Sequence, residues 1–289
     1  GHTQKVAEET ARRREALKPK ETGLILGSGR DSAPEAPAAP KKKGPGLSLP
    51  VHSFKLDTGL TVVVSPDHAG PTVAVSITYK VGSQHEKRGR SGFAHLFEHL
   101  MAQGTRNLKP REISKLIEGN GGMRNAYTTR TNTTYHSMVP KSALEVVLWA
   151  EADRMHTLDV NARALALEKQ VVLEEMRRSY LNQPYRKAQD AGMAEAAFTK
   201  WENRHTTIGE AEDIRNAELE DVRAFYKAHY APNNAVLSIA GDVTLEEARA
   251  LAGRYFGPIP AKPIAPEPDL SEPPMEGERR VEVADPLAE

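Results

Sequence analysis

The chain has 289 residues, which is enough to bury one large core or two smaller ones. Its 39 basic and 39 acidic side chains balance, so no net field favours binding to nucleic acid or to a membrane surface. It has no cysteine and no apolar run long enough to span a bilayer. This composition excludes disulfides, thiolate metal sites, thiol nucleophiles and a membrane-spanning helix.

Residues 1–47 are predicted to form a flexible arm. The stretch from Gly27 to Gly46 is rich in Gly, Pro, Ala, Ser and Lys, and such a stretch buries too little apolar surface to offset its ordering entropy. The run Lys41-Lys42-Lys43 is interpreted as part of this solvated arm rather than as a binding patch. The chain opens with Gly1 rather than Met, so we expect a processed or recombinant N-terminus from which a targeting segment can already have been removed.

Strand patterns begin the globular part of the chain near Leu47. Val51–Leu56 and Leu60–Val64 flank the turn signal Asp57-Thr58-Gly59 and are predicted to form a hairpin. Val73–Val81 alternates apolar and polar residues, which predicts a further strand.

The next segment contains the pattern H-x-x-E-H, as His95-Leu96-Phe97-Glu98-His99. On an α-helix, residues three and four apart share a face, so His95, Glu98 and His99 project together. Two neutral imidazoles one turn apart can hold a divalent ion, usually zinc, and a carboxylate between them can take a proton from metal-bound water. The alternative is two surface histidines with a glutamate between them, which the rarity of the pattern in this composition disfavours.

Further helices and strands follow in chain order. Helices are predicted over Arg111–Glu118, Ser142–Met155, Asn161–Tyr180, Ala188–Phe198, Leu219–His229 and Leu245–Phe256, and strands over Met123–Thr129, Thr133–Val139 and Ala235–Ala240. Seven prolines then fall within residues 258–275, which predicts a stiff, extended linker and a domain boundary. Arg279–Val283 is predicted to be a strand that begins a truncated second domain over residues 276–289. We therefore expect the chain to be cut, processed or completed by another polypeptide.

The helix predicted over Asn161–Tyr180 offers a third metal ligand. Catalytic zinc usually takes three protein ligands, and Glu168 and Glu175 are seven residues apart, so they share a helix face to within about 20°. Two aligned carboxylates on an otherwise apolar helix favour a cation as their partner. The alternative is that both are surface glutamates paired with Lys169, Arg177 or Arg178, and helix geometry alone leaves the two readings even.

Five separated motifs resemble, in order, those of the inverted zincin metallopeptidases, the family of pitrilysin, insulin-degrading enzyme and the mitochondrial processing peptidase. They are Gly92–Met101 with Gly104-Thr105, Gly121–Thr128, Ala152–Met155, Glu168–Glu175, and Tyr230–Asn234 with a strand ending in Gly241-Asp242. The resemblance covers roughly residues 48–257 and identifies that range as a zinc metallopeptidase catalytic domain.

The resemblance implies the roles of the site residues. His95, His99 and Glu175 are expected to bind Zn2+, and Glu98 to act as the general base. Glu168 is expected to support catalysis by orienting the site and tuning its charge. We commit to an α+β fold in which a mostly antiparallel sheet carries helices packed on one face, and the resemblance makes this the first-domain half of a two-half peptidase clamshell.

Substrate contacts are also implied. Asn125 and Ala126 match the family's substrate-docking strand, and an exposed strand edge can take an extended peptide as an additional strand. The alternative for Asn125 is an ordinary residue of a turn or strand end. The family's second half supplies an Arg/Tyr pair to the scissile carbonyl, so a second family-like half or partner subunit is expected.

Two functions remain open at this point. The first is a zinc endopeptidase, or its catalytic subunit, that hydrolyses extended or unfolded peptides. The second is a non-catalytic peptide-binding or assembly subunit of the same fold. The intact set His95, Glu98, His99 and Glu175 favours the first. The resemblance suggests the periplasm or cell envelope as the location, with the cytoplasm as the alternative.

Overall fold

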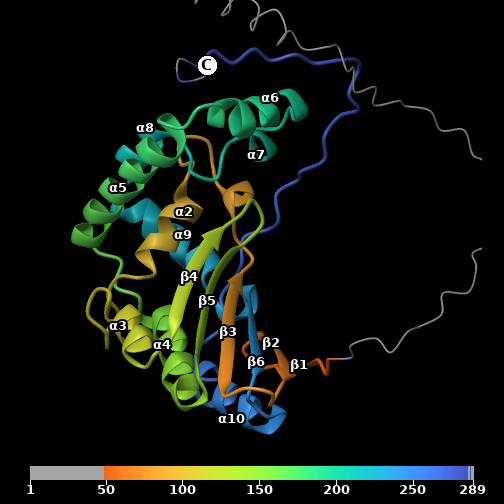
Figure 1. The fold of residues 1–289 in the computed structure, drawn as a ribbon. Helices are drawn as coiled ribbons and strands as arrows, with labels where there is room; N and C mark the ends of the chain where they lie inside the picture. Colours follow the sequence, from red (N-terminus) through yellow and green to blue (C-terminus); the bar gives the residue numbers. More distant parts are fainter. Residues whose placement is uncertain (1–48, 286, 288–289) are drawn as a thin grey trace, which may run out of the picture. The chain divides into compact units, whose positions relative to one another are not determined.

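A six-stranded sheet organises the described part of the chain. This computed structural model describes residues 49–285 and 287, so the arm predicted for residues 1–47 lies outside the described residues. The strands are β1 (His52–Lys55), β2 (Thr61–Pro66), β3 (Thr72–Tyr79), β4 (Met123–Thr128), β5 (Thr133–Pro140) and β6 (Ala235–Gly241). Their spatial order is β1-β2-β6-β3-β5-β4 (Figure 1). Only β2 and β6 pair in parallel, so the prediction of a mostly antiparallel sheet is confirmed.

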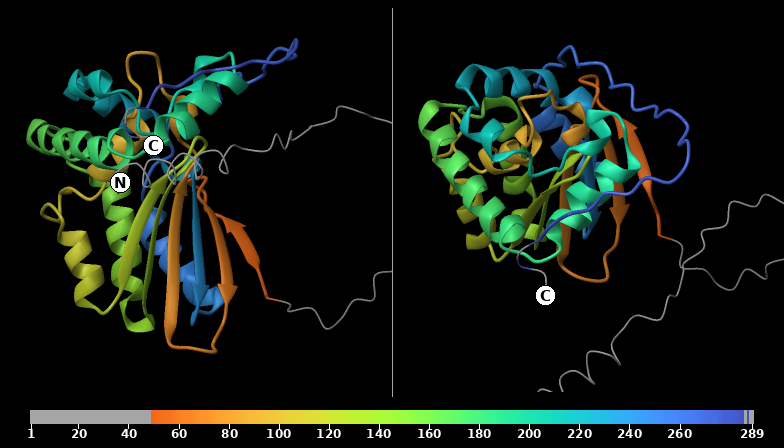
Figure 2. Two further views of the ribbon diagram at one scale, coloured as in Figure 1. Left: turned by 45° about the horizontal axis from the view of Figure 1, so that its top comes forward. Right: turned by 90° about the horizontal axis from the view of Figure 1, so that it is seen from above.

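One face of this sheet is covered by helices. Along β3, Val73, Val75 and Ile77 are buried, while the alternating residues Thr72 and Ala74 are exposed. Helix α4 (Leu144–Thr157) contacts β3, helix α10 (Leu245–Phe256) contacts β2, and the two helices contact each other. Figure 2 shows these helices on the same side of the strands. The predicted α+β fold with helices on one face is therefore confirmed.

The remaining helices lie mostly where the hydrophobic periodicity predicts them. They are α2 (Phe93–Leu100), α3 (Glu112–Gly119), α5 (Ala162–Met176), α6 (Met193–Ala197), α7 (Trp201–Arg204), α8 (Ala211–Arg215) and α9 (Leu219–His229). Short 3-10 turns cover Ser83–His85, Lys141–Ala143 and Pro232–Asn234, and π-helical turns cover Arg177–Leu181 and Ala188–Gly192. The short helices α7 and α8 were not predicted, because four or five residues carry too little periodicity.

Helix α5 shows why the local sequence determines a helix boundary. The side chain of Asn161 accepts a hydrogen bond from the backbone N–H of Ala164 at 2.9 Å and caps the helix. After Met176 the chain continues as the π-helical turn 177–181, so the helix predicted over Asn161–Tyr180 is present with a wider final turn.

Helix α2 is wedged between the sheet and helix α9. The Phe97 ring stacks on Phe225 at a centroid distance of 5.3 Å, and the Tyr135 hydroxyl of β5 donates to the Phe97 carbonyl at 3.2 Å. Helix α5 packs against the other side of α2. These contacts hold the H-x-x-E-H helix rigidly between three elements.

The Pro-rich segment is extended, as predicted, and it is bound to the domain (Figure 1). Asn233 and Lys262 exchange two hydrogen bonds of 2.8 and 3.1 Å, and His85 Nε2 lies 3.0 Å from Glu267 Oε2. The strand predicted over Arg279–Val283 is wrong, because these residues have no neighbouring strand with which to form a ladder. Among the described residues, no helix is both long and apolar enough to cross a membrane.

Candidate metal centre

The site is built on the first turn of α2. Gly92 caps the helix with a φ of 82°, a left-handed conformation that glycine adopts without strain. The two carboxylate oxygens of the buried Glu86 accept hydrogen bonds from the N–H groups of Gly92 and Ala94, each at 2.8 Å. Glu86 therefore satisfies two free donors of the helix N-terminus and fixes where the helix begins.

His95, His99 and Glu175 come together between α2 and α5. His95 Nε2 lies 3.7 Å from Glu175 Oε1, and His99 Nε2 lies 3.3 Å from Glu175 Oε2. One ligand atom from each of the three residues lies within 4.8 Å of the other two. Two imidazole nitrogens and one carboxylate oxygen are a donor set that suits a catalytic zinc ion. The residues present therefore fit the metal that the sequence predicts.

The charges around these side chains favour a cation. Burial and the positive charge of His99 lower the pKa of His95 to about 4. The ring is therefore neutral at pH 7, and one of its two nitrogens has a free lone pair for a metal ion. Burial opposes the charged form of His99, but hydrogen bonds to Glu168 and Glu175 outweigh it and raise the pKa of His99 to about 9. The hydrogen bond from His99 in turn lowers the pKa of Glu175.

Glu98 lies beside the same cluster and has a partner that was not predicted. The Thr128 hydroxyl, at the end of β4, donates to Glu98 Oε2 at 2.6 Å. Burial raises the pKa of Glu98, which suits a group that takes up and releases a proton. The sequence carried one signal for this contact: Arg124, Ala126 and Thr128 alternate onto the same face of β4.

Glu168 is buried behind His99 rather than exposed. Its carboxylate accepts a hydrogen bond from Gln103 and lies 3.5 Å from His99 Nδ1, the ring nitrogen opposite the one that faces Glu175. This is where a residue that orients the His99 ring is expected. The alternative of surface glutamates paired with cations is wrong here, because Arg177 pairs with Glu174 instead.

Asn125 and Ala126 lie on β4, the strand at the edge of the sheet. The Asn125 side chain is exposed, and its Oδ1 accepts the N–H of Ala126 at 2.9 Å. A peptide that pairs with this edge would compete with the Asn125 side chain for that N–H. The alternative of a turn residue for Asn125 is wrong, because it lies inside the strand.

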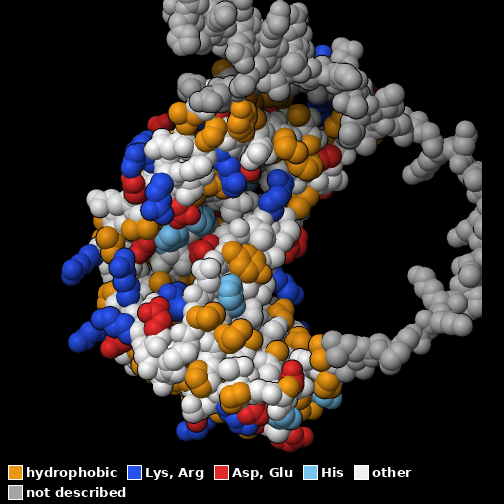
Figure 3. Space-filling model, viewed as in Figure 1, with side chains coloured by type: hydrophobic (Ala, Val, Ile, Leu, Met, Phe, Trp, Pro, Cys, Tyr) orange, Lys and Arg blue, Asp and Glu red, His pale blue; other side chains and the backbone are white. Residues whose placement is uncertain are grey.

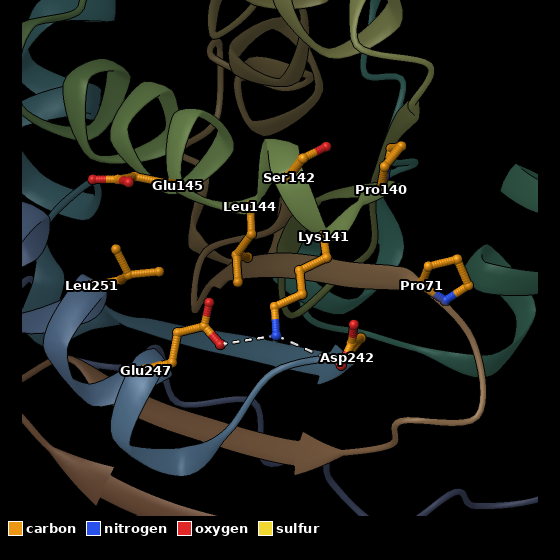
Figure 4. A pocket seen from close by; sticks show the side chains of 9 residues that line it. All are labelled: Pro71, Pro140, Lys141, Ser142, Leu144, Glu145, Asp242, Glu247 and Leu251. Atoms are coloured by element: carbon orange, nitrogen blue, oxygen red, sulfur yellow. Dashed lines mark ion pairs between the residues drawn. The ribbon is translucent and has the colours of Figure 1, made fainter.

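Two pockets beside the sheet differ in whether they contain the predicted site residues. One, of about 230 Å³, is lined by Glu98, His99 and residues of β4. Figure 3 shows histidine and acidic side chains gathered at the surface on the face that carries α2 and α5 in Figure 1. The other, of about 700 Å³, lies at the far end of β5 and contains ion pairs from Lys141 to Asp242 and Glu247, but none of the predicted site residues (Figure 4).

Comparison with known proteins finds the same family that the motifs resemble. A model of the insulinase family, peptidase family M16, matches residues 61–208, and a model of the peptidase M16 inactive domain matches residues 216–288. The zinc protease PqqE of Helicobacter pylori is 33% identical over 240 residues, which is 80% of this chain and 53% of that protein. A probable mitochondrial-processing peptidase subunit beta of Schizosaccharomyces pombe is 28% identical over 221 residues, 75% of this chain and 47% of that protein.

A solved protease structure has the same fold as this chain. The crystal structure of a protease from Helicobacter pylori superimposes with a TM-score of 0.74 at 31% identity, and the match covers 78% of this chain and 55% of that one. The chain thus spans about half the length of the relatives that it matches. The residues matched by the insulinase model include both histidines of α2, and Glu168 and Glu175 of α5.

Proposed function

Because the chain belongs to the insulinase family of peptidases, family M16, we propose that it is a zinc-dependent endopeptidase or the catalytic subunit of one. Its substrates are extended or unfolded peptides. The observation that carries the proposal is the meeting of His95, His99 and Glu175 within 4.8 Å, with Glu98 beside them.

The residues divide the chemistry between them. His95, His99 and Glu175 would hold the ion, and zinc in such a site supplies Lewis acidity and a water of pKa about 7. Glu98 uses its Oε1, since Oε2 is bound by Thr128, to take a proton from the attacking water and to return it to the leaving amine. Glu168 orients the His99 ring. The β4 edge, at Asn125 and Ala126, binds the peptide backbone as an added strand.

A non-catalytic subunit of the same fold is the second candidate. It is favoured by the match of residues 216–288 to a domain described as inactive. In the first candidate, residues 48–257 form the catalytic domain, residues 258–275 link it onward, and residues 276–289 begin a second domain. A second half or partner subunit then completes the enzyme.

We place the protein in the periplasm or cell envelope, with the cytoplasm as the alternative, and cell fractionation tests this.

Replacing the general base separates the two candidates. Glu98→Gln should lower the rate of peptide hydrolysis by about 10²–10⁴, because proton transfer is lost. Zinc content and peptide affinity should be unchanged, since neither depends on that proton. The measurements are turnover of a quenched fluorescent peptide, metal content by mass spectrometry, and fluorescence anisotropy. Wild-type protein that contains zinc and binds peptide without cleaving it, even when joined to its second half, would establish the non-catalytic function.

The metal ligand on α5 has a matched control beside it. Glu175→Gln should abolish stoichiometric zinc binding, while Glu174→Gln should keep about one zinc per chain, because Glu174 pairs with Arg177 at the surface. Removing zinc with a chelator should also lower the melting temperature, since a ligand at 100 times its Kd stabilises the folded state by about 2.7 kcal/mol. Equal zinc content in the two variants would contradict the assignment of Glu175.

A further inference from the structure

A pocket of about 230 Å³ adjoins the metal site on the helix-covered side of β4. Its lining includes Glu98, His99 and Glu168 from α2 and α5, and Arg111, Arg124 and Ala126 from the start of α3 and from β4. Because the pocket shares Glu98 and His99 with the candidate catalytic centre, a side chain that enters it lies next to the peptide bond being cleaved.

The two arginines bring positive charge to this pocket. Arg111 is exposed and caps α3 with a φ of 63°, a left-handed conformation that is uncommon outside glycine. Its backbone N–H donates to the carbonyl of Ala102 at 3.0 Å, which keeps it at the pocket. Arg124 is half-buried, and its Nη1 donates to Ser114 Oγ at 2.7 Å. Within residues 49–285, no ion pair within 4.0 Å joins either guanidinium to a carboxylate, and Glu151 and Glu118 act on Arg124 only from a greater distance.

The carboxylates of the pocket are oriented by donors other than these two arginines. Glu98 is bound by Thr128, and Glu168 is bound by Gln103 and faces His99. Burial lowers the pKa of Arg124, so its cation has lost part of its hydration. An anion in the pocket would compensate the Arg124 cation for its lost hydration. A carboxylate suits this role, because its two oxygens match the planar fork of a guanidinium.

The geometry of β4 directs a substrate side chain into the same space. Arg124, Ala126 and Thr128 lie on the helix-covered face of the strand because side chains alternate. A peptide paired with the free edge of β4 alternates in the same way, so every second side chain points toward the pocket. Arg124 lies four residues before Thr128 on β4, and the Thr128 hydroxyl binds Glu98, so Arg124 is offset from Glu98 along a peptide that pairs with this strand.

We infer that this pocket is a specificity subsite for an acidic side chain of the substrate, with Arg111 and Arg124 as the partners of its carboxylate. The inference rests on the proposed peptidase function and adds a substrate class to it, namely peptides with Asp or Glu close to the cleaved bond.

The test uses one unstructured quenched peptide in which Asp or Asn is placed in turn at four positions on each side of the cleaved bond. The full chain loaded with zinc gives kcat/KM, and the full Glu98→Gln chain gives Kd without turnover. At one position, or at two alternate positions, Asp should be preferred over Asn by at least about tenfold in both assays. The preference should weaken as salt is raised.

Variants locate the preference. Arg111→Gln and Arg124→Gln should each bring the Asp/Asn ratio toward one, because the Asp peptides lose more than the Asn peptides, and Arg124→Lys should retain part of the ratio if the Gln variant misfolds. Arg106→Gln, an exposed arginine outside the pocket, should leave the ratio intact. Cleavage with equal Asp and Asn values at every position overturns the subsite and leaves the peptidase standing. An Asp preference in binding without any cleavage, also after the chain is joined to its second half, supports the subsite and overturns the peptidase function.

Discussion

His205 presents both ring nitrogens to oxygen acceptors near the start of helix α2. Nε2 lies 3.0 Å from Glu86 Oε2, and Nδ1 lies 2.8 Å from the Trp201 carbonyl. An imidazole can donate from both nitrogens only when it is protonated. Burial opposes that charge, but the hydrogen bonds to Glu86 and Trp201 outweigh it and raise the pKa of His205 above 6.5. Glu86 also binds the first N–H groups of α2, so the protonation of His205 affects the residue that caps this helix.

This pair predicts a pH dependence of stability. Because the pKa of His205 is raised on folding, its contribution is complete below about pH 6.5 and is lost as the pH rises through the folded value. Because the pKa of His99 is also raised and His99 titrates in the same range, the measured quantity is the difference in the free energy of unfolding between wild type and His205→Gln. This difference, obtained by urea denaturation from pH 6 to 9.5, should fall over that window by about 1.5–3 kcal/mol.

The His205→Gln variant provides the control for this measurement. It should be less stable than wild type at pH 6 and should approach wild type at pH 9.5, since the charge is absent from the variant at every pH. A fall in stability of the same size in both proteins would show that another group titrates in this range.

At the scale of elements, two loops approach closely where α2 begins. Gly209 has a φ of 76°, and a Cβ atom there would lie 2.6 Å from Gly92 Cα and 2.5 Å from the Ser91 carbonyl carbon. Ser91 strengthens the same junction, because its Oγ donates to Asp213 at 2.6 Å and accepts the N–H of Glu210 at 2.9 Å. The segment before α8 is thus held tightly against the N-terminus of α2.

Alanine substitutions at two glycines test this junction. Gly209→Ala should destabilise the protein by at least about 2 kcal/mol, since it combines a clash with a strained backbone. It should also weaken zinc binding, because α2 has to shift. Gly253→Ala in α10 has no heavy atom within 4 Å of the new Cβ and should stabilise by about 0.5–1 kcal/mol. Denaturation midpoints of the two variants give both values, and equal effects would contradict a tight junction.

At the scale of the whole molecule, the carboxylate of Glu272 adds a cluster of hydrogen bonds to those that bind the Pro-rich segment to the domain. Glu272 accepts hydrogen bonds from the Thr199 N–H at 2.9 Å, the Thr199 hydroxyl at 2.6 Å and the Asn203 amide at 2.6 Å, and a longer one from the Lys200 N–H. The Asn203 and Thr199 hydrogen bonds lower the pKa of Glu272 to about 2. This contact sets the direction in which the chain leaves the domain.

Removing that carboxylate should release the segment. Glu272→Ala is expected to speed hydrogen exchange at the amides of Thr199 and Lys200 by about tenfold, because both lose their acceptor. Glu276→Ala, four residues along the same segment, should leave both amides unchanged. Mass spectrometry of the exchanged peptides reports this, and zinc content should stay constant. Unchanged exchange in Glu272→Ala would mean that other contacts hold the segment.

The sequence by itself determined the helices of the site and the spacing of their ligands. His95, Glu98 and His99 share a face because helix geometry is local, and the same rule aligned Glu168 with Glu175. The Asn161 cap and the alternation of β3 likewise depend on neighbours within a few residues. These features follow from short-range hydrogen bonding and periodicity.

Only the tertiary structure decided how distant parts meet. It inserted β6 between β2 and β3, turned Glu175 toward both histidines and Glu168 behind His99, and brought Thr128 to Glu98. It also paired Glu86 with His205 across more than a hundred residues and left Arg111 beside the site. No local pattern specifies these contacts, because each depends on burying the apolar faces of elements that are far apart in the chain.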